Sequence, residues 1–98
     1  MSDTPSFAGQ VALVTGASRG IGAAIAAELA ARGLKVVGTA TTDDGAARIT
    51  AALSAHAGCR GIKLDVNDGA AAEAAIESIV KEHGGLQVLV NNAGITRD

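Results

Sequence analysis

Residues 15–22, Thr15-Gly16-Ala17-Ser18-Arg19-Gly20-Ile21-Gly22, form the stretch that decides the fold of this chain. It joins a short apolar run over 11–15, typical of a buried strand, to a longer run over 21–32 with helical spacing. The first N–H groups of a helix lack partners and lie at the positive end of its dipole, so they bind phosphates where no Cβ blocks the approach. The stretch therefore predicts a phosphate-binding loop between a strand and a helix.

Each glycine of this loop has an expected task. Gly16 should make the sharp exit from the strand, Gly20 should let the backbone approach a pyrophosphate, and Gly22 should let the helix pack closely on the sheet. The prediction requires the backbone amides between residues 16 and 22 to be free to meet a diphosphate. The alternative is that the three glycines only form a tight strand-to-helix turn.

The rest of the chain alternates short β-branched runs with longer alanine-rich runs. Strands are expected over residues 11–15, 35–40, 61–66 and 86–91. Helices are expected over 21–32 with Gly33 at the end, from the capping residues 42–44 onward, and from Asn67-Asp68 to Gly84-Gly85. The apolar positions expected to recur on one face of each helix are Ile21, Ile25 and Leu29, then Ile49, Ala52 and Leu53, then Ala72, Ile76, Ile79 and Val80.

This order of elements predicts the α/β class. We expect a three-layer, doubly wound Rossmann fold with a parallel sheet, of which the chain supplies the βαβαβαβ first half in strand order 3-2-1-4. Residues 1–8 are expected to be a flexible lead, and residues 9–98 to be the amino-terminal, NADP(H)-binding half of a Rossmann domain. The fourth strand should present an unpaired apolar edge, so the isolated half is expected to associate with other chains.

Composition excludes several classes of function. Of the 98 residues, 48% are hydrophobic and 18% are charged, and the formal net charge of −2 is scattered along the chain. A nucleic-acid partner is not expected, because there is no basic patch and Phe7 is the only aromatic residue. Without a signal-like start or a long apolar run, no membrane association is expected and the protein is predicted to be cytoplasmic. Cys59 is the single cysteine, and no metal site is predicted.

The glycine spacing Gly-x-x-x-Gly-x-Gly departs from the Gly-x-Gly-x-x-Gly of the common dinucleotide fingerprint. With this spacing, TGASRGIG resembles the signature of the short-chain dehydrogenase/reductase family, in which the longer loop holds the adenosine end of NAD(P). Asp65-Val66 and Asn91 to Gly94 fall at the carboxyl ends of expected strands, the side on which ligands bind, and resemble the family segments that meet the adenine and the adenosine ribose. The resemblance implies cofactor-binding roles for Gly16, Ala17, Ser18, Arg19, Gly20, Ile21, Gly22, Thr41, Asp65, Val66, Asn92, Ala93 and Gly94. Taken alone, Asp65 would be interpreted as a helix-capping residue and the Asn-Asn-Ala-Gly segment as a turn.

The end of the second expected strand indicates which nucleotide the loop binds. An NAD site would place Asp or Glu there to bind the ribose 2′-OH, whereas this sequence has Thr39-Ala40-Thr41-Thr42. Without that carboxylate nothing repels a 2′-phosphate, and Arg19 in the loop is positioned to pair with it. The expected cofactor is therefore NADP(H). The alternative is that Arg19 is an ordinary solvated charge and that Asp43 or Asp44 folds back onto a ribose hydroxyl.

From about Gly9 to Asp98 the sequence resembles the 3-oxoacyl-[acyl-carrier-protein] reductases and the related acetoacetyl-CoA reductases of this family. The similarity is clear in Asn-Asn-Ala-Gly-Ile-Thr-Arg-Asp at residues 91–98 and in Gly-Thr-Ala-Thr-Thr at residues 38–42. It implies an NADPH-dependent enzyme of fatty-acid biosynthesis that reduces a 3-oxoacyl thioester of acyl-carrier protein to the 3-hydroxyacyl thioester. It also implies a homo-oligomer, which is a tetramer in full-length relatives.

The groups that perform this chemistry in the family are a Tyr, a Lys, a Ser and an Asn, and all lie beyond the matched stretch. The chain contains no Tyr, so no catalytic residue is assigned and the 98-residue chain alone is expected to be inactive. His56 and His83 lie near expected helix ends and are interpreted as solvated or dipole-facing groups. The alternatives are a non-catalytic nucleotide-binding or scaffold fragment, a reductase of another substrate such as acetoacetyl-CoA, and a half-domain designed or excised for folding studies.

Overall fold

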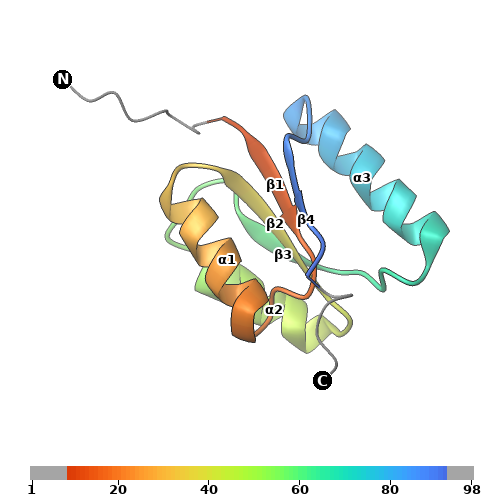
Figure 1. Ribbon diagram of the computed structural model, residues 1–98, viewed down its shortest axis with the longest axis horizontal. Coiled ribbons are helices and arrows are strands. Elements are labelled where there is room, and N and C mark those ends of the chain that lie inside the picture. The colour runs from red at the N-terminus through yellow and green to blue at the C-terminus, as the bar shows by residue number, and fades with distance from the viewer. Residues whose placement is uncertain (1–8, 93–98) are drawn as a thin grey trace.

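Four parallel strands form one sheet in the computed structural model, which describes residues 9–92 (Figure 1). They are β1 (Val11–Val14), β2 (Lys35–Ala40), β3 (Arg60–Lys63) and β4 (Val88–Val90), in the order β3-β2-β1-β4. The predicted α/β class and the strand order 3-2-1-4 are confirmed. Because the order reverses at β1, the switch point of the sheet lies just beyond the end of this strand.

Within residues 9–92, three helices cover the two faces of the sheet (Figure 1). α1 (Gly20–Ala31) and α2 (Asp43–Ala52) pack on one face, and α3 (Gly69–His83) packs on the other. Since all strands run in the same direction, their carboxyl ends gather with the start of α1 at one edge, toward the bottom of Figure 1. The structure therefore has the three layers that the alternation of elements predicts.

β1 is buried on both faces, as its continuous apolar sequence predicts. Ala12 and Val14 pack in the core beneath α1 and α2, while Val11 and Leu13 pack with Ile79 of α3. Successive residues of a strand point to opposite faces, so a strand between two helical layers needs an apolar side chain at every position.

The helix ends follow the capping signals in the sequence. The side chains of Thr42 and Asp68 each accept a hydrogen bond from the backbone amide three residues further on, at 3.0 and 3.1 Å, and so begin α2 and α3. Gly33 and Gly84 follow α1 and α3 with left-handed φ angles of 99° and 85°. Both glycines were predicted at these positions, because a residue without Cβ adopts this conformation at little cost.

α1 packs through a different face from the one that its large apolar residues indicate. Its buried positions are Gly22, Ala26 and Ala30, whereas Ile21 is 65% exposed. Ile25 and Leu29 are only partly buried at the rim of the core. The helix lies closest to the sheet where its side chains are smallest, so the stripe of small residues faces β1 and β2.

The other two helices follow their predicted faces with two exceptions. Ile49, Leu53 and Ile79 are fully buried, as expected. Ala52, in the last turn of α2, is exposed, and Val80 of α3 is 40% exposed. Both residues adjoin a buried position in the sequence, so the helical turn of about 100° per residue carries them out of the core.

Ile49 of α2 rests on a part of the sheet that has no side chains. Gly38 and Gly61 are register partners on β2 and β3. An added Cβ on Gly38 would lie 2.9 Å from Ile49 Cγ2, and one on Gly61 would lie 2.6 Å from Ile49 Cβ. Ile49 is 2% exposed, so the two glycines allow α2 to approach the sheet and bury this side chain.

The last two strands are shorter than the predicted ranges 61–66 and 86–91. Beyond β3, pairing continues for one residue, because the Leu64 amide donates to Ala40 O at 2.8 Å. The chain then turns, since Asp65 Oδ1 accepts a hydrogen bond from the Asn67 amide at 2.9 Å. Asp and Asn favour such turns by binding the backbone two residues on, a local effect that the apolar pattern does not contain.

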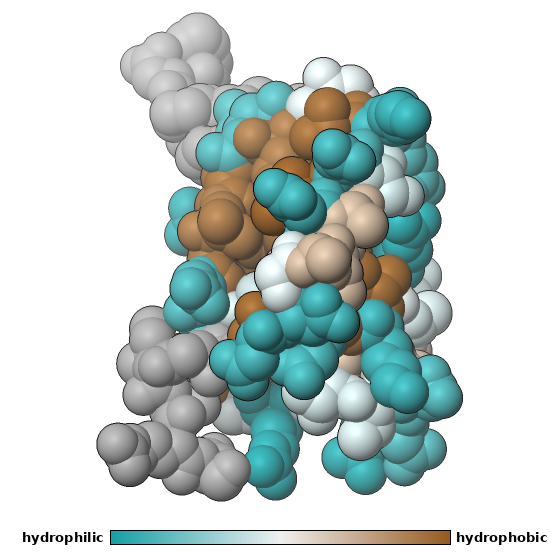
Figure 2. Space-filling view, turned by 90° about the vertical axis from the view of Figure 1, so that its right-hand side faces the viewer, coloured by the Kyte–Doolittle hydropathy of each residue, from teal (hydrophilic) through white to brown (hydrophobic). Residues whose placement is uncertain are grey.

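β4 is one of the two edge strands of the sheet within the part of the chain that the structure describes, and β3 is the other. β4 pairs with β1 on one side only, and its Leu89 is 57% exposed. Leu89, Leu13 and Ile76 line an apolar groove of about 160 Å³ between the sheet and α3. Figure 2 views the side on which α3 lies and shows apolar residues gathered over part of that face. The predicted unpaired apolar edge is present within these residues.

Across residues 9–92 no helix is long and apolar enough to cross a membrane.

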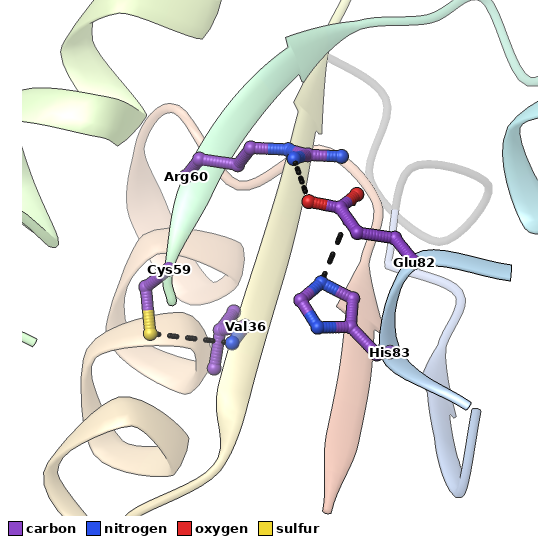
Figure 3. Close-up of polar contacts among 5 residues, drawn as sticks. All are labelled: Val36, Cys59, Arg60, Glu82 and His83. Carbon is purple, nitrogen blue, oxygen red and sulfur yellow. Dashed lines mark hydrogen bonds and ion pairs between the residues drawn. The ribbon is translucent and has the colours of Figure 1, made fainter. Parts of the chain in front are cut away.

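Cys59 lies just before β3 and its thiol bonds the backbone of β2 (Figure 3). Its Sγ accepts a hydrogen bond from the Val36 amide at 3.2 Å and lies 3.5 Å from Leu34 O, to which it donates. The thiol therefore satisfies a backbone group of β2 that lies ahead of the first residue paired with β3. It is a partly buried structural cysteine, as expected of a free thiol beside a turn.

A polar cluster joins the end of α3 to the start of β3 (Figure 3). Arg60 Nη1 lies 2.8 Å from Glu82 Oε2, and His83 Nε2 lies 3.9 Å from Glu82 Oε1. The hydrogen bond from Arg60 is the main reason that the pKa of Glu82 lies below its ordinary value of 4.5. Desolvation opposes this shift, and the charges of Arg60 and His83 add to it. His83 lies at the carboxyl end of α3, the dipole-facing position expected for it.

The shift in Glu82 makes a pH-dependent prediction for Glu82→Gln. A carboxyl whose pKa is lowered by folding contributes stability above its unfolded pKa and loses that contribution as the pH falls through the lower folded value. The variant should therefore melt below the wild type near pH 7, and the difference should close as the pH is lowered below 4.5. Thermal unfolding across this range measures it. The matched control is Glu73→Gln on the same helix, which removes a carboxylate that forms no ion pair within residues 9–92. A gap for Glu82→Gln that stays constant with pH would contradict the prediction.

Candidate functional site

A groove opens at the carboxyl edge of the sheet, beside the start of α1. Its volume is about 380 Å³, within the range of roughly 300–1,000 Å³ that small-molecule sites occupy. It is formed by the glycine loop, the end of β2 and the residues that follow β3 and β4. The lining residues are Gly16, Ser18, Arg19, Gly20, Ile21, Thr39, Ala40, Thr41, Leu64, Val66 and Asn92. Gly16, Ser18, Arg19, Gly20, Ile21, Thr41, Val66 and Asn92 are predicted site residues, so the structure brings together most of the predicted set.

The glycine loop leaves β1 through two left-handed residues. Gly16 has a φ of 63° and Gly20 a φ of 65°, conformations that residues with a Cβ rarely adopt. A Cβ added at Gly20 would meet no atom within 4 Å, so the need for glycine there comes from its backbone angle. The sharp exit predicted for Gly16 is confirmed.

The loop amides divide into two groups. Gly16 N donates to Thr39 Oγ1 at 3.3 Å, and Ala17 N donates to Thr39 O at 2.9 Å. The amides of residues 18–22 form no hydrogen bond with any residue in the range 9–92, and the Arg19 side chain at the N-cap accepts none. The expectation that all amides from 16 to 22 are free is therefore wrong for the first two, which are paired inside the protein, and holds for the other five.

Asn92 ties the end of β4 to the glycine loop. This side chain is 6% exposed, and its Nδ2 donates to Gly16 O at 3.1 Å. The Thr15 amide, one residue before Gly16, donates to the carbonyl oxygen of Val90, two residues before Asn92, at 3.0 Å. An added Cβ on Gly22 would lie 2.6 Å from Asn92 Nδ2 and would overlap Gly16 O. Gly22 therefore has the close-packing task predicted for it, and the contact includes the loop and the end of β4 as well as the helix.

Arg19 supplies the positive charge of the groove. It is exposed and forms no ion pair within the described residues, while Thr41 is exposed nearby in the same lining. Asp43 and Asp44 lie in the first turn of α2 and are absent from the lining. Among the lining residues, therefore, there is one cation and no carboxylate, an arrangement suited to an anionic ligand. Within residues 9–92 no three His, Cys, Asp or Glu side chains are grouped so as to hold a metal ion.

Three predicted site residues lie outside the lining. Ala17 and Gly22 are buried behind the loop, where they allow it to pack. Asp65 is exposed, and its carboxylate accepts from the Asn67 amide in the turn after β3. The helix cap is Asp68 instead, so Asp65 is a turn residue in this structure and its role toward an adenine stays a prediction. Ala93 and Gly94, also predicted, lie outside the described residues.

Three lining residues were not predicted. Thr39 and Ala40 are the last two residues of β2, and Leu64 directly follows β3. All three precede a predicted site residue by one or two positions. Since ligands of open α/β sheets contact the carboxyl ends of the strands, the strand-end rule applied to whole strand termini would have included them.

The chain is similar to known proteins over nearly its whole length. The family model for short chain dehydrogenases matches residues 10–98. The 3-oxoacyl-[acyl-carrier-protein] reductases FabG of Salmonella typhimurium (strain LT2) and Escherichia coli (strain K12) are each 56% identical over 93 residues, which is 95% of this chain. The protein of the same name from Pseudomonas aeruginosa is 50% identical over 94 residues. The chain spans 37% of the length of the first two relatives and 38% of the third.

The family match includes the elements that build the groove. It starts at residue 10, just before β1, and continues through the glycine loop, the end of β2 and Asn92. The resemblance inferred from the glycine spacing is thereby confirmed. With the family model matched from residue 10 to residue 98, the chain belongs to the short chain dehydrogenase family.

Proposed function

We propose that this chain binds NADPH and forms the cofactor-binding part of an enzyme that reduces a 3-oxoacyl thioester of acyl-carrier protein to the 3-hydroxyacyl thioester. The observation that carries the proposal is the run of unpaired amides at residues 18–22, beside a groove that holds one cation and no carboxylate. Family membership supports a nicotinamide cofactor. The similarity to 3-oxoacyl-[acyl-carrier-protein] reductases supports the substrate class and a place in fatty-acid biosynthesis.

The free amides account for the diphosphate of the cofactor. α1 has no side-chain cap at its start, so its first N–H groups and the positive end of its dipole face a ligand without competition from the protein. A phosphate at that point gains several charge-assisted hydrogen bonds, each worth about 1.5–3 kcal/mol. We assign Ser18, Gly20 and Ile21 to this contact, with Gly16 and Gly22 shaping the loop around it.

The adenosine end of the cofactor is assigned to the other side of the groove. Val66 and Leu64 offer an apolar surface for the adenine, and Asn92 reaches the groove from β4. Asp65, Ala93 and Gly94 keep the contacts that the family resemblance implies. The same proposal includes a cytoplasmic location and a homo-oligomeric assembly.

The preference for NADPH over NADH is assigned to Arg19 and Thr41. Both residues line the groove, where a carboxylate would repel a 2′-phosphate and none is present among the lining residues. The guanidinium of Arg19 forms no ion pair within residues 9–92, so binding a phosphate breaks no existing ion pair. A guanidinium binds phosphate oxygens through a planar set of donors, and the Thr41 hydroxyl adds one more.

Replacing Arg19 with alanine is expected to weaken NADPH binding by about 10- to 100-fold and to leave NADH binding nearly unchanged. The range follows from about 1.5–3 kcal/mol for a charge-assisted hydrogen bond at 1.4 kcal/mol per tenfold. Fluorescence titration of the purified chain with each cofactor measures both dissociation constants. Arg48→Ala is the matched control, because Arg48 is exposed on α2 and absent from the groove lining. Equal losses for NADPH and NADH would remove the assignment of Arg19 to the 2′-phosphate.

The reduction requires a proton donor in addition to the cofactor. When bound, the nicotinamide supplies a hydride to the carbonyl carbon of the substrate, and the carbonyl oxygen gains a proton. The family uses a Tyr to donate that proton, and this chain has none. Within the proposal, the residues of this chain therefore bind and orient the cofactor, and no residue here is assigned to proton transfer.

The alternative function is that of a nucleotide-binding or scaffold unit without catalysis. The groove and its free amides suit this function as well, because they account for nucleotide binding and not for proton transfer. The test uses a protein that contains this chain and is as long as the relatives it matches. The two functions differ in whether this protein oxidises NADPH when a 3-oxoacyl thioester is added. Oxidation of NADPH supports the reductase, whereas binding without oxidation supports the scaffold. Oxidation with acetoacetyl-CoA alone would indicate another substrate within the same family.

A further inference from the structure

We infer that Thr39 is a positioning residue for the nucleotide site, which it serves by holding the glycine loop so that the amides of residues 18–22 stay free. The inference rests on the proposed function and adds to it a residue that contacts the loop from the neighbouring strand. Thr39 is 1% exposed at the end of β2, and it belongs to the groove lining.

The contact between Thr39 and the loop uses both of its oxygens. Thr39 Oγ1 accepts from the Gly16 amide at 3.3 Å, and Thr39 O accepts from the Ala17 amide at 2.9 Å. Two successive loop amides are thus held by one residue of β2, at the point where Gly16 turns the chain out of β1 with a φ of 63°. After Ala17 no loop amide is held by the protein within residues 9–92 until the first turn of α1 is complete.

Thr39 therefore binds the last two loop amides that are paired within the protein, and the free amides begin directly after them. Without an acceptor at Oγ1, the part-buried Gly16 amide loses its partner in the protein, and a donor that is shielded from water without a partner is costly. The loop then gains an alternative in which it shifts to pair this amide elsewhere. Such a shift moves the next amides away from the geometry that a phosphate needs, and the cost of restoring it appears as weaker binding.

Substitutions at Thr39 can test the effect of its hydroxyl separately from the effect of its methyl group on packing. Thr39→Val keeps the branched shape and the backbone carbonyl but removes Oγ1, whereas Thr39→Ser keeps the oxygen and removes the methyl group. Thr39→Ala removes both, so the pair Ser and Ala differs by the hydroxyl alone. This second pair gives the same comparison if the valine variant does not fold.

The experiment has two readouts on the full chain, amide hydrogen exchange and NADPH titration. In Thr39→Val we expect the Gly16 amide to exchange faster relative to the Val37 amide, which lies two residues earlier in the core of β2. We expect the dissociation constant for NADPH to rise about two- to tenfold, the range of one neutral hydrogen bond. Thr39→Ser should restore both values, and Thr39→Ala should lose both.

Each result decides the inference. An unchanged ratio of Gly16 to Val37 exchange in Thr39→Val would show that Oγ1 does not hold the loop, and would overturn it. Faster Gly16 exchange with unchanged NADPH affinity would also overturn it, because Thr39 would then order the loop without serving the site. Failure of the wild-type chain to bind NADPH is a separate outcome that removes the proposed function, and the positioning role falls with it.

Discussion

Replacing Ile49 with alanine is expected to lower the free energy of unfolding by about 2–5 kcal/mol, the usual range for a buried isoleucine. Ile49 is 2% exposed and lies over Gly38 and Gly61, which have no side chains that could move into the space it leaves. The cavity should therefore collapse poorly, and the loss should fall in the upper part of the range. Urea unfolding followed by circular dichroism measures it, since the helices of this chain provide the signal.

The matched control for Ile49 is Ile21→Ala. The residue type is the same, but Ile21 is 65% exposed at the start of α1. Its replacement should change the free energy of unfolding by no more than about 0.5 kcal/mol, as for most surface positions. Similar losses for the two variants would contradict the packing of α2 on the glycine pair described above.

Replacing Gly22 with alanine is expected to destabilise the chain by about 1–3 kcal/mol and to weaken NADPH binding at the same time. The added methyl group would overlap Gly16 O and lie 2.6 Å from Asn92 Nδ2. Backbone and a buried amide cannot move aside as a flexible side chain can, so the start of α1 must shift away from the loop. Thermal unfolding and NADPH titration of the same sample measure the two effects.

Gly69→Ala is the matched control for Gly22→Ala. Gly69 is the first residue of α3 and Gly22 is the third residue of α1, but a Cβ on Gly69 meets no atom within 4 Å. This variant should be neutral or more stable by about 0.4–1 kcal/mol, because alanine reduces the freedom of the unfolded chain. The prediction is wrong if the Gly22→Ala variant is as stable as the wild type and binds NADPH with unchanged affinity. The close contact between α1, the loop and Asn92 would then not be needed for the site.

The order of elements was predictable from the sequence because each boundary has a local chemical cause. Thr42 and Asp68 accept hydrogen bonds from the first turns of their helices, and Gly33 and Gly84 take the left-handed conformation that ends them. The packing face of α1 was not predictable in the same way. Nearly every residue of this helix is apolar or small, so periodicity does not distinguish its faces, and the distance to the sheet selects the smallest side chains.

The candidate site was predictable where one segment forms it and less so where strands meet. The glycine loop and Thr41 directly follow expected strands, and Val66 was assigned from the family resemblance at the carboxyl end of one. The role of Thr39 depends on which loop amides lie opposite β2, a matter of register between strands that the pattern along one strand does not contain. For Asp65, the backbone turn toward Asn67 competes for the carboxylate, and local geometry of that kind appears only when the chain is folded.

The bond from Asn92 to Gly16 spans 76 positions of the sequence. During synthesis, residues 15–22 leave the ribosome long before Asn92 exists, so the early polypeptide carries the glycine motif without the amide that fixes its carbonyl. Contacts this distant in sequence form late, because the intervening chain must first be ordered. Nucleotide affinity should therefore arise only once the fourth strand has joined the sheet. Binding of the cofactor would then indicate that this region has finished folding.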